Sequence, residues 1–344
     1  MSESSQTFMR REIEEIPTAV GRLLTDGNAM LREAGELIRR KRPDVVVTVA
    51  RGSSDHAATY LAYAVELATG IPVASLGPSV SSVYHSRLRL HHAACLAISQ
   101  SGRSPDVVSV VENAKASNAV TLALTNMPGS PLAAAADHLV DLMAGPEISV
   151  AATKSFVASI AAGLAVLAHW TQDDALLDAL AALPQQLEQA IGCDWSALGD
   201  ALADKNSLFV LGRGPSNAIA NEAALKFKET CGMHAEAYSA AEVLHGPASI
   251  IRAGFPVLAL VVRDAGEASM TTTTAQLAKQ GANVFATSNG TPGAHPLPFV
   301  VTNHPLTEPL TLIASFYRFV EELARRRGLD PDTPPHLHKV TETL

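Results

Sequence analysis

The chain has 344 residues, of which 47% are hydrophobic and 17% charged, and its formal net charge is −8. This composition is enough for one large or two medium globular domains with sizeable cores. The negative charge gives no support for nucleic-acid binding, and we expect no nucleic-acid partner. An anionic substrate would have to be held by local contacts, because the overall field of the protein opposes it.

The cysteines and the N-terminus predict the compartment. Cys95, Cys193 and Cys231 are far apart and lack metal-ligand spacing, so we expect reduced and mostly buried thiols. Residues 1–7 are polar and lack the apolar core of a signal peptide. The apolar run 160–170 is too short to cross a bilayer. We therefore predict a cytoplasmic protein that has no membrane partner.

Helix-like and strand-like segments alternate along the chain. Residues 1–40 predict helices, and residues 171–200 predict a helical linker that Pro184 interrupts. Residues 330–344 are predicted to form an irregular, proline-rich tail. The predicted strands are 45–49, 94–98, 120–124, 207–211, 257–261 and 284–286. Strands that alternate with helices are typical of an α/β fold with parallel sheets.

The chain repeats itself at a constant offset of 162 residues. Arg51-Gly52 aligns with Arg213-Gly214, and Gly70 aligns with Gly232. The same offset aligns Leu96-Ala97-Ile98 with Leu258-Ala259-Leu260, and Thr125 with Thr287. Four landmarks at one offset indicate two copies of one α/β unit, which we place at 41–170 and 201–329.

Two serine-bearing turns in the first copy are candidates for phosphate binding. Ser99, Ser101 and Ser104 follow a predicted buried strand and precede a helix, and Ser53 and Ser54 stand in the preceding turn of this kind. Strand-to-helix turns point backbone N–H groups and the positive end of a helix at one spot. An ordinary serine-rich turn is the alternative. Neighbouring parallel strands would bring both turns to one phosphate.

The second copy lacks these hydroxyl groups. Its equivalent turn is Val261-Val262-Arg263-Asp264-Ala265-Gly266, in which the aspartate would repel a phosphate. We therefore predict one phosphate pocket per chain, in the first copy.

A polar helix is predicted over 217–232, with Ser216 as its N-cap and Gly232 as its end. Glu222, Lys226 and Glu229 are spaced to share one face. A surface stripe of ion pairs is the common meaning of this pattern. In a partly closed cleft the same groups would suit proton transfer at carbon.

The histidines that follow this helix have separate interpretations. His245 stands in a turn before Gly246-Pro247, where it could titrate near neutrality and open a sugar ring, or serve only as a loop hydrogen-bonding group. His234 and Glu236 alternate as on one face of a strand, but without a third ligand they predict no metal site. Farther back, Glu147 and Lys154 are either site residues or a structural ion pair, and we favour the structural role for both.

Together these residues resemble the sugar isomerase (SIS) family, and within it the isomerase half of the glutamine–fructose-6-phosphate aminotransferases. The resemblance covers nearly the whole chain, and it implies two tandem SIS domains, each a Rossmann-like three-layer αβα unit. It rests also on the triad Glu222, Lys226 and Glu229. The other matching motifs are Ser99-Gln100-Ser101-Gly102, Gly145-Pro146-Glu147-Ile148, Thr153-Lys154, Leu211-Gly212-Arg213-Gly214, His234-Ala235-Glu236-Ala237-Tyr238, His245-Gly246-Pro247 and the tail from Asp330 to Thr341.

The resemblance implies roles for individual residues. It assigns the phosphate to Ser99, Gln100, Ser101 and Ser104, with help from Ser53 and Ser54, and backbone contacts with the sugar to Gly52 and Val150. It makes Glu229 the base that moves a proton between C1 and C2, with Lys226 in support. His245 would open the ring and come from the other subunit of a homodimer. Lys339 would form a Schiff base or close the site.

Three departures from the family pattern bear on function. A glutaminase domain with an N-terminal cysteine is not found before Cys95, so we expect no glutamine hydrolysis by that route. Arg51 replaces a smaller family residue, and Pro335-His336 replaces Arg-Asn. These changes bear on sugar specificity.

A free-standing isomerase half resembles the deaminases of this family. We therefore expect glucosamine 6-phosphate and water to give fructose 6-phosphate and ammonia, without a cofactor. The alternatives are an ammonia-dependent synthase that runs the reaction backwards, a fructosamine-6-phosphate deglycase, and a non-catalytic sugar-phosphate sensor. A sensor would not need Glu229, His245 and Lys339 together, and the segment before Pro43 is too short and acidic for a DNA-binding domain.

Overall fold

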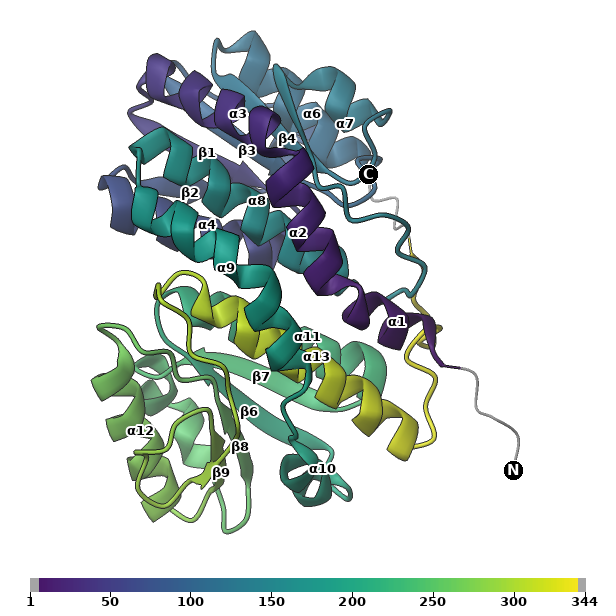
Figure 1. The fold of residues 1–344 in the computed structure, drawn as a ribbon, viewed down its shortest axis with the longest axis vertical. Helices are drawn as coiled ribbons and strands as arrows, with labels where there is room; N and C mark the ends of the chain where they lie inside the picture. The colour runs from purple at the N-terminus through teal and green to yellow at the C-terminus, as the bar shows by residue number, and fades with distance from the viewer. Residues whose placement is uncertain (1–5, 340–344) are drawn as a thin grey trace. The chain divides into compact units, whose positions relative to one another are not determined.

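A computed structural model describes residues 6–339 of the chain (Figure 1). The chain forms two compact units, and each contains one five-stranded parallel sheet. Among the described residues, the N-sheet unit comprises 17–147, 154–184 and 338–339. The C-sheet unit comprises 6–16, 148–153 and 185–337.

The sheet of the N-sheet unit has the strand order β2-β1-β3-β4-β5. Its strands are β1 (Val45–Val49), β2 (Val73–Ser75), β3 (Ala93–Ile98), β4 (Val120–Thr125) and β5 (His138–Asp141). The chain moves outward from β1 to β2 and then returns to place β3 on the other side of β1. The carboxyl ends of β1 and β3 therefore flank the topological switch point, where open α/β sheets bind ligands.

Helices cover both faces of this sheet. The helices of the unit are α2 (Ile16–Asp26), α3 (Asn28–Lys41), α4 (Ser53–Thr69), α5 (Ser79–Ser82), α6 (Pro105–Ala116), α7 (Pro131–Ala135) and α8 (Lys154–Thr171). Helices α3, α4 and α8 pack together on one face, and α6 and α7 cover the other (Figure 1). Strands that are buried on both faces read as nearly continuous apolar runs, which is why β3 and β4 are predicted from the sequence.

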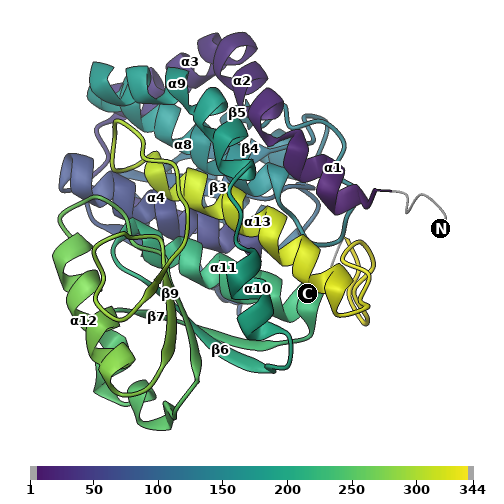
Figure 2. The same cartoon turned by 60° about the horizontal axis from the view of Figure 1, so that its bottom comes forward.

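The C-sheet unit repeats this plan, with the strand order β10-β9-β8-β6-β7. Its strands are β6 (Ser207–Gly212), β7 (His234–Ser239), β8 (Pro256–Ala259), β9 (Asn283–Ala286) and β10 (His295–Pro296). Its helical segments are α1 (Phe8–Glu14), α10 (Ser196–Leu202), α11 (Pro215–Cys231), η1 (Glu242–His245), η2 (Pro247–Ile250), α12 (Glu267–Lys279) and α13 (Glu308–Arg326). Helix α12 packs on one face of the sheet, and α11 lies on the other with α13 packed against it (Figure 2).

The repeat predicted from the offset of 162 is confirmed by these topologies. Read from the other edge, the second order is β7-β6-β8-β9-β10, which matches the first strand for strand. Gly52 and Gly214 precede the first helix of each copy with the same backbone angles, φ 56° and ψ −133°. A side chain would be strained in this conformation, so glycine is required at both turns. The fold class is therefore the predicted pair of three-layer α/β units.

Two local predictions about helices are wrong. Helix α9 (Asp174–Ile191) continues through Pro184 without interruption. The proline removes one backbone hydrogen bond of the helix, and the full burial of Leu183 and Leu187 on the same helix outweighs this loss. Ser216 is not an N-cap: Gly214 takes that position and Pro215 begins α11. The Ser216 hydroxyl instead accepts a hydrogen bond from the Arg213 N–H at 2.9 Å.

The predicted end of α11 and the predicted burial of two cysteines are confirmed. Gly232 ends the helix in the left-handed conformation, with φ 60°. Cys95 and Cys231 are buried, and burial raises the pKa of their thiols to about 12 and about 11. Helix α8 has the length and composition of a membrane span. The shorter apolar run 160–170 did not indicate this. However, 83% of the helix is buried inside the protein, as in a core helix.

The close packing of α3 on α8 generates a stability prediction. A Cβ atom on Gly35 would lie 2.6 Å from the Val166 carbonyl oxygen and 2.8 Å from the Trp170 nitrogen. Gly35→Ala should therefore lower the free energy of unfolding by about 1–3 kcal/mol, as measured by urea denaturation.

Gly21→Ala in α2 is the matched control, because its Cβ would meet Pro184 at an ordinary 3.8 Å. That variant should gain about 0.5–1 kcal/mol from helix propensity. Equal stabilities for the two variants would contradict the predicted packing constraint.

Candidate functional site

The serine-bearing turns of the N-sheet unit follow two adjacent strands. β1 pairs in parallel with β3, and Val49 is aligned with Ala97. Ser53 and Ser54 are the first two residues of α4, and Ser99 and Ser101 lie between β3 and α6. The predicted adjacency of the two turns at one sheet edge is therefore confirmed. Both turns lead into helices of at least 12 residues, whose N-termini favour an anion.

Local hydrogen bonds shape the second turn. Ser99 is nearly buried, and its hydroxyl accepts a hydrogen bond from the Gly102 N–H at 3.1 Å. The Gln100 carbonyl accepts one from the Asn126 N–H at 3.2 Å. Ser104 occupies the N-cap position of α6, but its side chain makes no capping hydrogen bond. The Ser104 hydroxyl therefore does not cap the helix, although capping is the usual role of a serine at the N-cap position.

Gly102 determines the backbone conformation of this turn. Its φ is +60°, and a Cβ atom there would lie 2.1 Å from the Ser130 hydroxyl. A larger residue would collide with Ser130, and it would also be strained in its backbone. The Ser-Gln-Ser-Gly turn thus depends on its glycine for both shape and packing.

The equivalent turn of the C-sheet unit is built differently. Arg263 forms an ion pair with the buried carboxylate of Glu308 and stacks on the ring of Phe299. Asp264 accepts a hydrogen bond from the Gly266 N–H at 2.7 Å, and burial raises the pKa of its carboxyl. A cavity of about 620 Å³ lies here, and these acidic and already paired groups do not suit a phosphate.

Helix α11 buries the charged triad that the sequence placed on one face. Glu222 and Lys226 have fully buried side chains, while that of Glu229 is 18% exposed. The Lys226 ammonium lies 3.2 Å from a Glu222 oxygen and 2.5 Å from a Glu229 oxygen. The alternative of a solvated stripe of surface ion pairs is therefore wrong.

The environment of Lys226 keeps it charged. Burial alone would lower its pKa, but the carboxylates of Glu222 and Glu229 outweigh burial and raise the pKa above its ordinary value. The Tyr317 hydroxyl on α13 donates a hydrogen bond of 3.0 Å to Glu222. Tyr317 was not predicted from the sequence, because this contact joins residues 95 positions apart.

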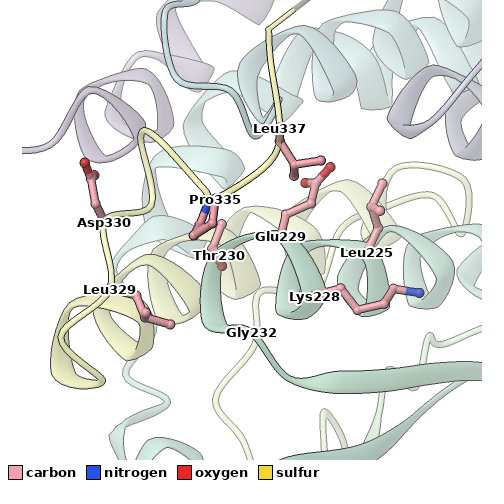
Figure 3. Close-up of a pocket in the computed structure, with 9 residues that line it drawn as sticks. All are labelled: Leu225, Lys228, Glu229, Thr230, Gly232, Leu329, Asp330, Pro335 and Leu337. Carbon is pink, nitrogen blue, oxygen red and sulfur yellow. The ribbon is translucent and has the colours of Figure 1, made fainter. Parts of the chain in front are cut away.

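Glu229 borders a cavity of about 470 Å³ (Figure 3). The cavity lies between the C-terminal half of α11 and the start of the tail. Its lining residues are Leu225, Lys228, Glu229, Thr230, Gly232, Leu329, Asp330, Pro335 and Leu337. Glu229 is thus the member of the triad that lies between a buried cation and an open space.

His245 ends the short helix η1, and its side chain is exposed. The neighbouring side chains Leu244 and Ile250 are also exposed, at 40% and 51%. His234 and Glu236 lie on one face of β7, as predicted, with 3.7 Å between the imidazole and the carboxylate.

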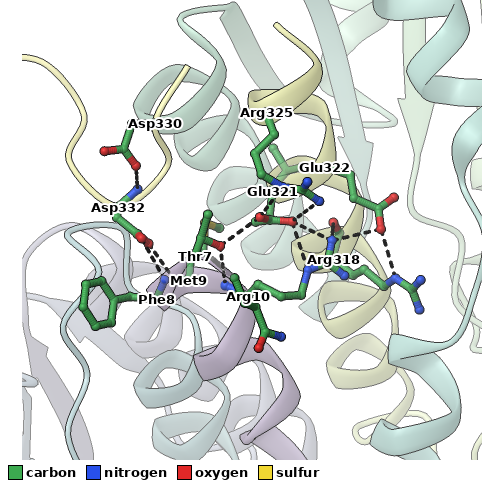
Figure 4. A network of polar contacts seen from close by, with 12 residues as sticks. Thr7, Phe8, Met9, Arg10, Arg318, Glu321, Glu322, Arg325, Asp330 and Asp332 are labelled. Carbon is green, nitrogen blue, oxygen red and sulfur yellow. Dashed lines mark hydrogen bonds and ion pairs between the residues drawn. The ribbon is translucent and has the colours of Figure 1, made fainter. Parts of the chain in front are cut away.

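The tail is fixed to α1 by Asp332 (Figure 4). Its two carboxylate oxygens accept hydrogen bonds from the N–H groups of Phe8 and Met9, both at 2.7 Å. Its carbonyl accepts one from the Val150 N–H at 3.2 Å. Val150, predicted as a sugar contact, therefore uses its backbone N–H to hold the tail.

A second set of contacts in Figure 4 secures α1 to α13. Arg10 forms ion pairs with Glu321 and Glu322, and the Thr7 hydroxyl donates to Glu321 at 2.9 Å. The side chain of Glu321 is fully buried, so its charge needs these partners. No local sequence pattern predicts this network, because its partners are more than 300 residues apart.

Lys339 is the last described residue, and its ammonium lies 3.2 Å from a Glu147 oxygen. The same carboxylate accepts hydrogen bonds from the N–H and the hydroxyl of Ser155 at the start of α8. Lys154 donates to the Pro146 carbonyl at 2.8 Å. These contacts give Glu147 and Lys154 structural roles, and Glu147 also binds the tail lysine. The predicted tail residues from Val340 to Thr341 lie outside the described residues.

The candidate residues thus form two groups. The N-sheet unit holds Gly52, the predicted phosphate residues and Lys339, whereas the C-sheet unit holds Val150, Lys226, Glu229 and His245. These groupings locate the residues and leave their predicted roles as predictions.

The duplicated parallel sheet and the serine-bearing turn define a class of α/β protein. A comparison with known protein families identifies this class. The family model of the SIS domain matches residues 38–169 and 201–287, so the chain belongs to the SIS domain family. The two matched segments fall on the two copies of the repeat.

Three known proteins show what this chain is similar to. The glutamine–fructose-6-phosphate aminotransferase (isomerizing) of Symbiobacterium thermophilum is 36% identical over 274 residues, which cover 74% of this chain and 44% of the relative. A crystal structure from Silicibacter pomeroyi DSS-3, assigned as a phosphosugar isomerase, is 55% identical with a TM-score of 0.93, and covers 95% of this chain and 100% of its own. The glucosamine-6-phosphate deaminase of Thermotoga maritima shares the fold, at 21% identity and a TM-score of 0.71, over 94% of this chain and 100% of its own.

The buried triad generates a prediction about stability and pH. Lys226→Met leaves the buried Glu222 carboxylate without its cation and should lower the free energy of unfolding by about 3–5 kcal/mol at neutral pH. The folded-state pKa of Lys226 is raised above 10.5, so its contribution is complete below that pH and is lost as the pH rises through the folded value.

Denaturation at a series of pH values measures this contribution. The stability difference between wild type and Lys226→Met should shrink in the alkaline range. A difference that stays constant into that range, or one that is negligible at neutral pH, would contradict the account.

Proposed function

We propose that this protein is an amino-sugar-phosphate isomerase and deaminase. It converts glucosamine 6-phosphate and water to fructose 6-phosphate and ammonia. The observation that carries the proposal is Glu229, a carboxylate beside the buried ammonium of Lys226 and at the edge of a cavity. A carboxylate in this setting suits the transfer of a proton between adjacent carbons.

The phosphate is the proposed anchor of the substrate. In the N-sheet unit, Ser53, Ser54 and the Ser99–Ser104 turn supply hydroxyls and helix N-termini at the switch point of the sheet. These groups hold a phosphate without a metal ion, because N–H and O–H donors satisfy its oxygens. The binding energy from this end of the sugar serves to position C1 and C2.

The proposed chemistry begins with ring opening, which His245 assists by proton transfer at the ring oxygen. Glu229 then removes the proton from C2, giving an enolamine, and returns a proton to C1. The C1 carbonyl oxygen takes up a proton and becomes a hydroxyl, the amine nitrogen loses one, and C2 becomes an imine. Water adds to this imine and ammonia leaves, giving the C2 ketone of fructose 6-phosphate. One carboxylate serves both carbons, and the Lys226 ammonium lies 2.5 Å from one of its oxygens.

We propose two alternative roles for Lys339, and both are compatible with this reaction. Its amine forms a Schiff base with the open ketose, or its ammonium closes the site and stabilises charge. In its present contact with Glu147 the lysine is held as an ion pair. A Schiff base requires a neutral amine, so Lys339 would first have to release its proton.

The reaction predicts ammonia as a product. Purified protein incubated with glucosamine 6-phosphate should release ammonia and fructose 6-phosphate in equal amounts, measured by coupled enzymatic assays. Glucosamine without its phosphate is the control, and it should react far more slowly because it lacks the anchor.

Other outcomes favour other reactions of this site. Activity on a fructosamine 6-phosphate with none on glucosamine 6-phosphate would replace the deaminase by a deglycase. Glucosamine 6-phosphate formed from fructose 6-phosphate and ammonia, with no measurable reverse reaction, would indicate the synthase direction. Binding without turnover of any of these sugars would indicate a sensor.

The exposed His245 and its exposed apolar neighbours support a site shared between two chains. Glu229→Gln and His245→Ala subunits, each inactive alone, should therefore regain activity when they are mixed. In a two-fold dimer, each hybrid carries one intact site, so random mixing should restore roughly a quarter of wild-type activity.

Mixing each variant with itself under the same refolding conditions is the control. Without sharing, every site of a hybrid keeps one of the two substitutions. No recovery of activity in verified hybrid dimers would therefore show that His245 acts within its own chain.

A further inference from the structure

Arg51 joins the two serine-bearing turns of the N-sheet unit. It stands between β1 and α4, and its guanidinium reaches Asp106 near the start of α6. The Nε and Nη2 groups donate hydrogen bonds of 3.0 and 2.7 Å to the same Asp106 oxygen. The Asp106 side chain is 1% exposed, whereas that of Arg51 is 52% exposed.

The position of Asp106 explains why this ion pair matters. Asp106 is the second residue of α6, two positions after Ser104, and its other oxygen accepts a hydrogen bond from the Val107 N–H at 2.8 Å. A buried carboxylate near this turn would repel a phosphate if its charge were not balanced. The guanidinium supplies that balance from the opposite turn.

The two copies of the repeat show that the pair accompanies the serines. Arg213 is the equivalent of Arg51, and it stands before the same glycine conformation. The residue equivalent to Asp106 at the offset of 162 is Ala268. Arg213 instead donates a hydrogen bond of 3.3 Å to the Ser239 hydroxyl. The copy without the hydroxyl-rich turn therefore has the arginine but not the buried acid.

We propose that Arg51 is a positioning residue for the substrate phosphate. It neutralises Asp106 and fixes the two serine-bearing turns relative to each other, so that together they accept a dianion. This inference rests on the proposed phosphate site and adds a determinant of its affinity. Asp55 and His56 on α4 and the exposed Arg103 are the other charged or titratable side chains of these turns.

Inorganic phosphate is the probe, because its binding requires no turnover. Isothermal titration should show binding about tenfold weaker in Arg51→Met, the order expected when a close compensating charge is lost near a protein surface. Arg51→Lys keeps a cation without the planar fork and should fall between wild type and Arg51→Met. Arg51→Met combined with Asp106→Asn removes both charges and should recover most of the affinity.

Arg89→Met is the control for net charge, because Arg89 is exposed in the loop before β3, away from the carboxyl ends of the strands. It should bind phosphate as wild type does. With glucosamine 6-phosphate, Arg51→Met should raise KM about tenfold and change kcat less than twofold, since the reacting carbons are unaffected. A general loss of folding would not separate KM from kcat in this way.

Three results with the variants would overturn the inference. One is unchanged phosphate affinity in Arg51→Met. Another is an equal loss in Arg89→Met, which would indicate a general field effect. The third is a double variant as weak as Arg51→Met. If wild type itself binds no phosphate, the proposed site and the role of Arg51 fail together, whereas phosphate binding without ammonia release contradicts only the proposed reaction.

Discussion

The parallel pairing of β1 with β3 is the constraint on which the candidate phosphate site depends. Five aligned residue pairs, from Val45–Ala93 to Val49–Ala97, end both strands at one level of the sheet. Each strand then gives way to a turn and a helix, so hydroxyls and helix N-termini from two separate segments reach the same edge. The positive φ of Gly52 and the packing of Gly102 against Ser130 determine the shapes of these turns.

The two copies of the duplicated unit carry different polar groups. Both copies keep the same strand order and the same glycine before the first helix. The first copy has the serine turn and the Arg51–Asp106 pair, whereas the second has Asp264 and a paired Arg263 at the equivalent edge. The second copy instead buries a charged triad in α11, the helix that corresponds to α4. The hydroxyl-rich turn thus belongs to one copy, and the charged triad to the other.

The sequence predicted those features that local patterns determine. Apolar runs predicted the buried strands β1, β3, β4, β6, β8 and β9 to within a few residues, and the constant offset predicted the duplication. Helical spacing placed Glu222, Lys226 and Glu229 on one face. Spacing alone left their burial open, since that depends on α13, whose Tyr317 contacts Glu222. The anchoring of the tail by Asp332 and the pairing of Arg51 with Asp106 are likewise contacts between distant segments, which no local pattern encodes.

The central claim is that Glu229 moves the proton and the serine turns hold the phosphate. Solvent deuterium exchange at C2 of glucosamine 6-phosphate, followed by NMR alongside a titration with inorganic phosphate, tests both halves in one variant. The account predicts that Glu229→Gln loses the exchange while its affinity for phosphate stays within about twofold of wild type. Exchange that persists in Glu229→Gln, or phosphate binding that disappears with it, would contradict the account.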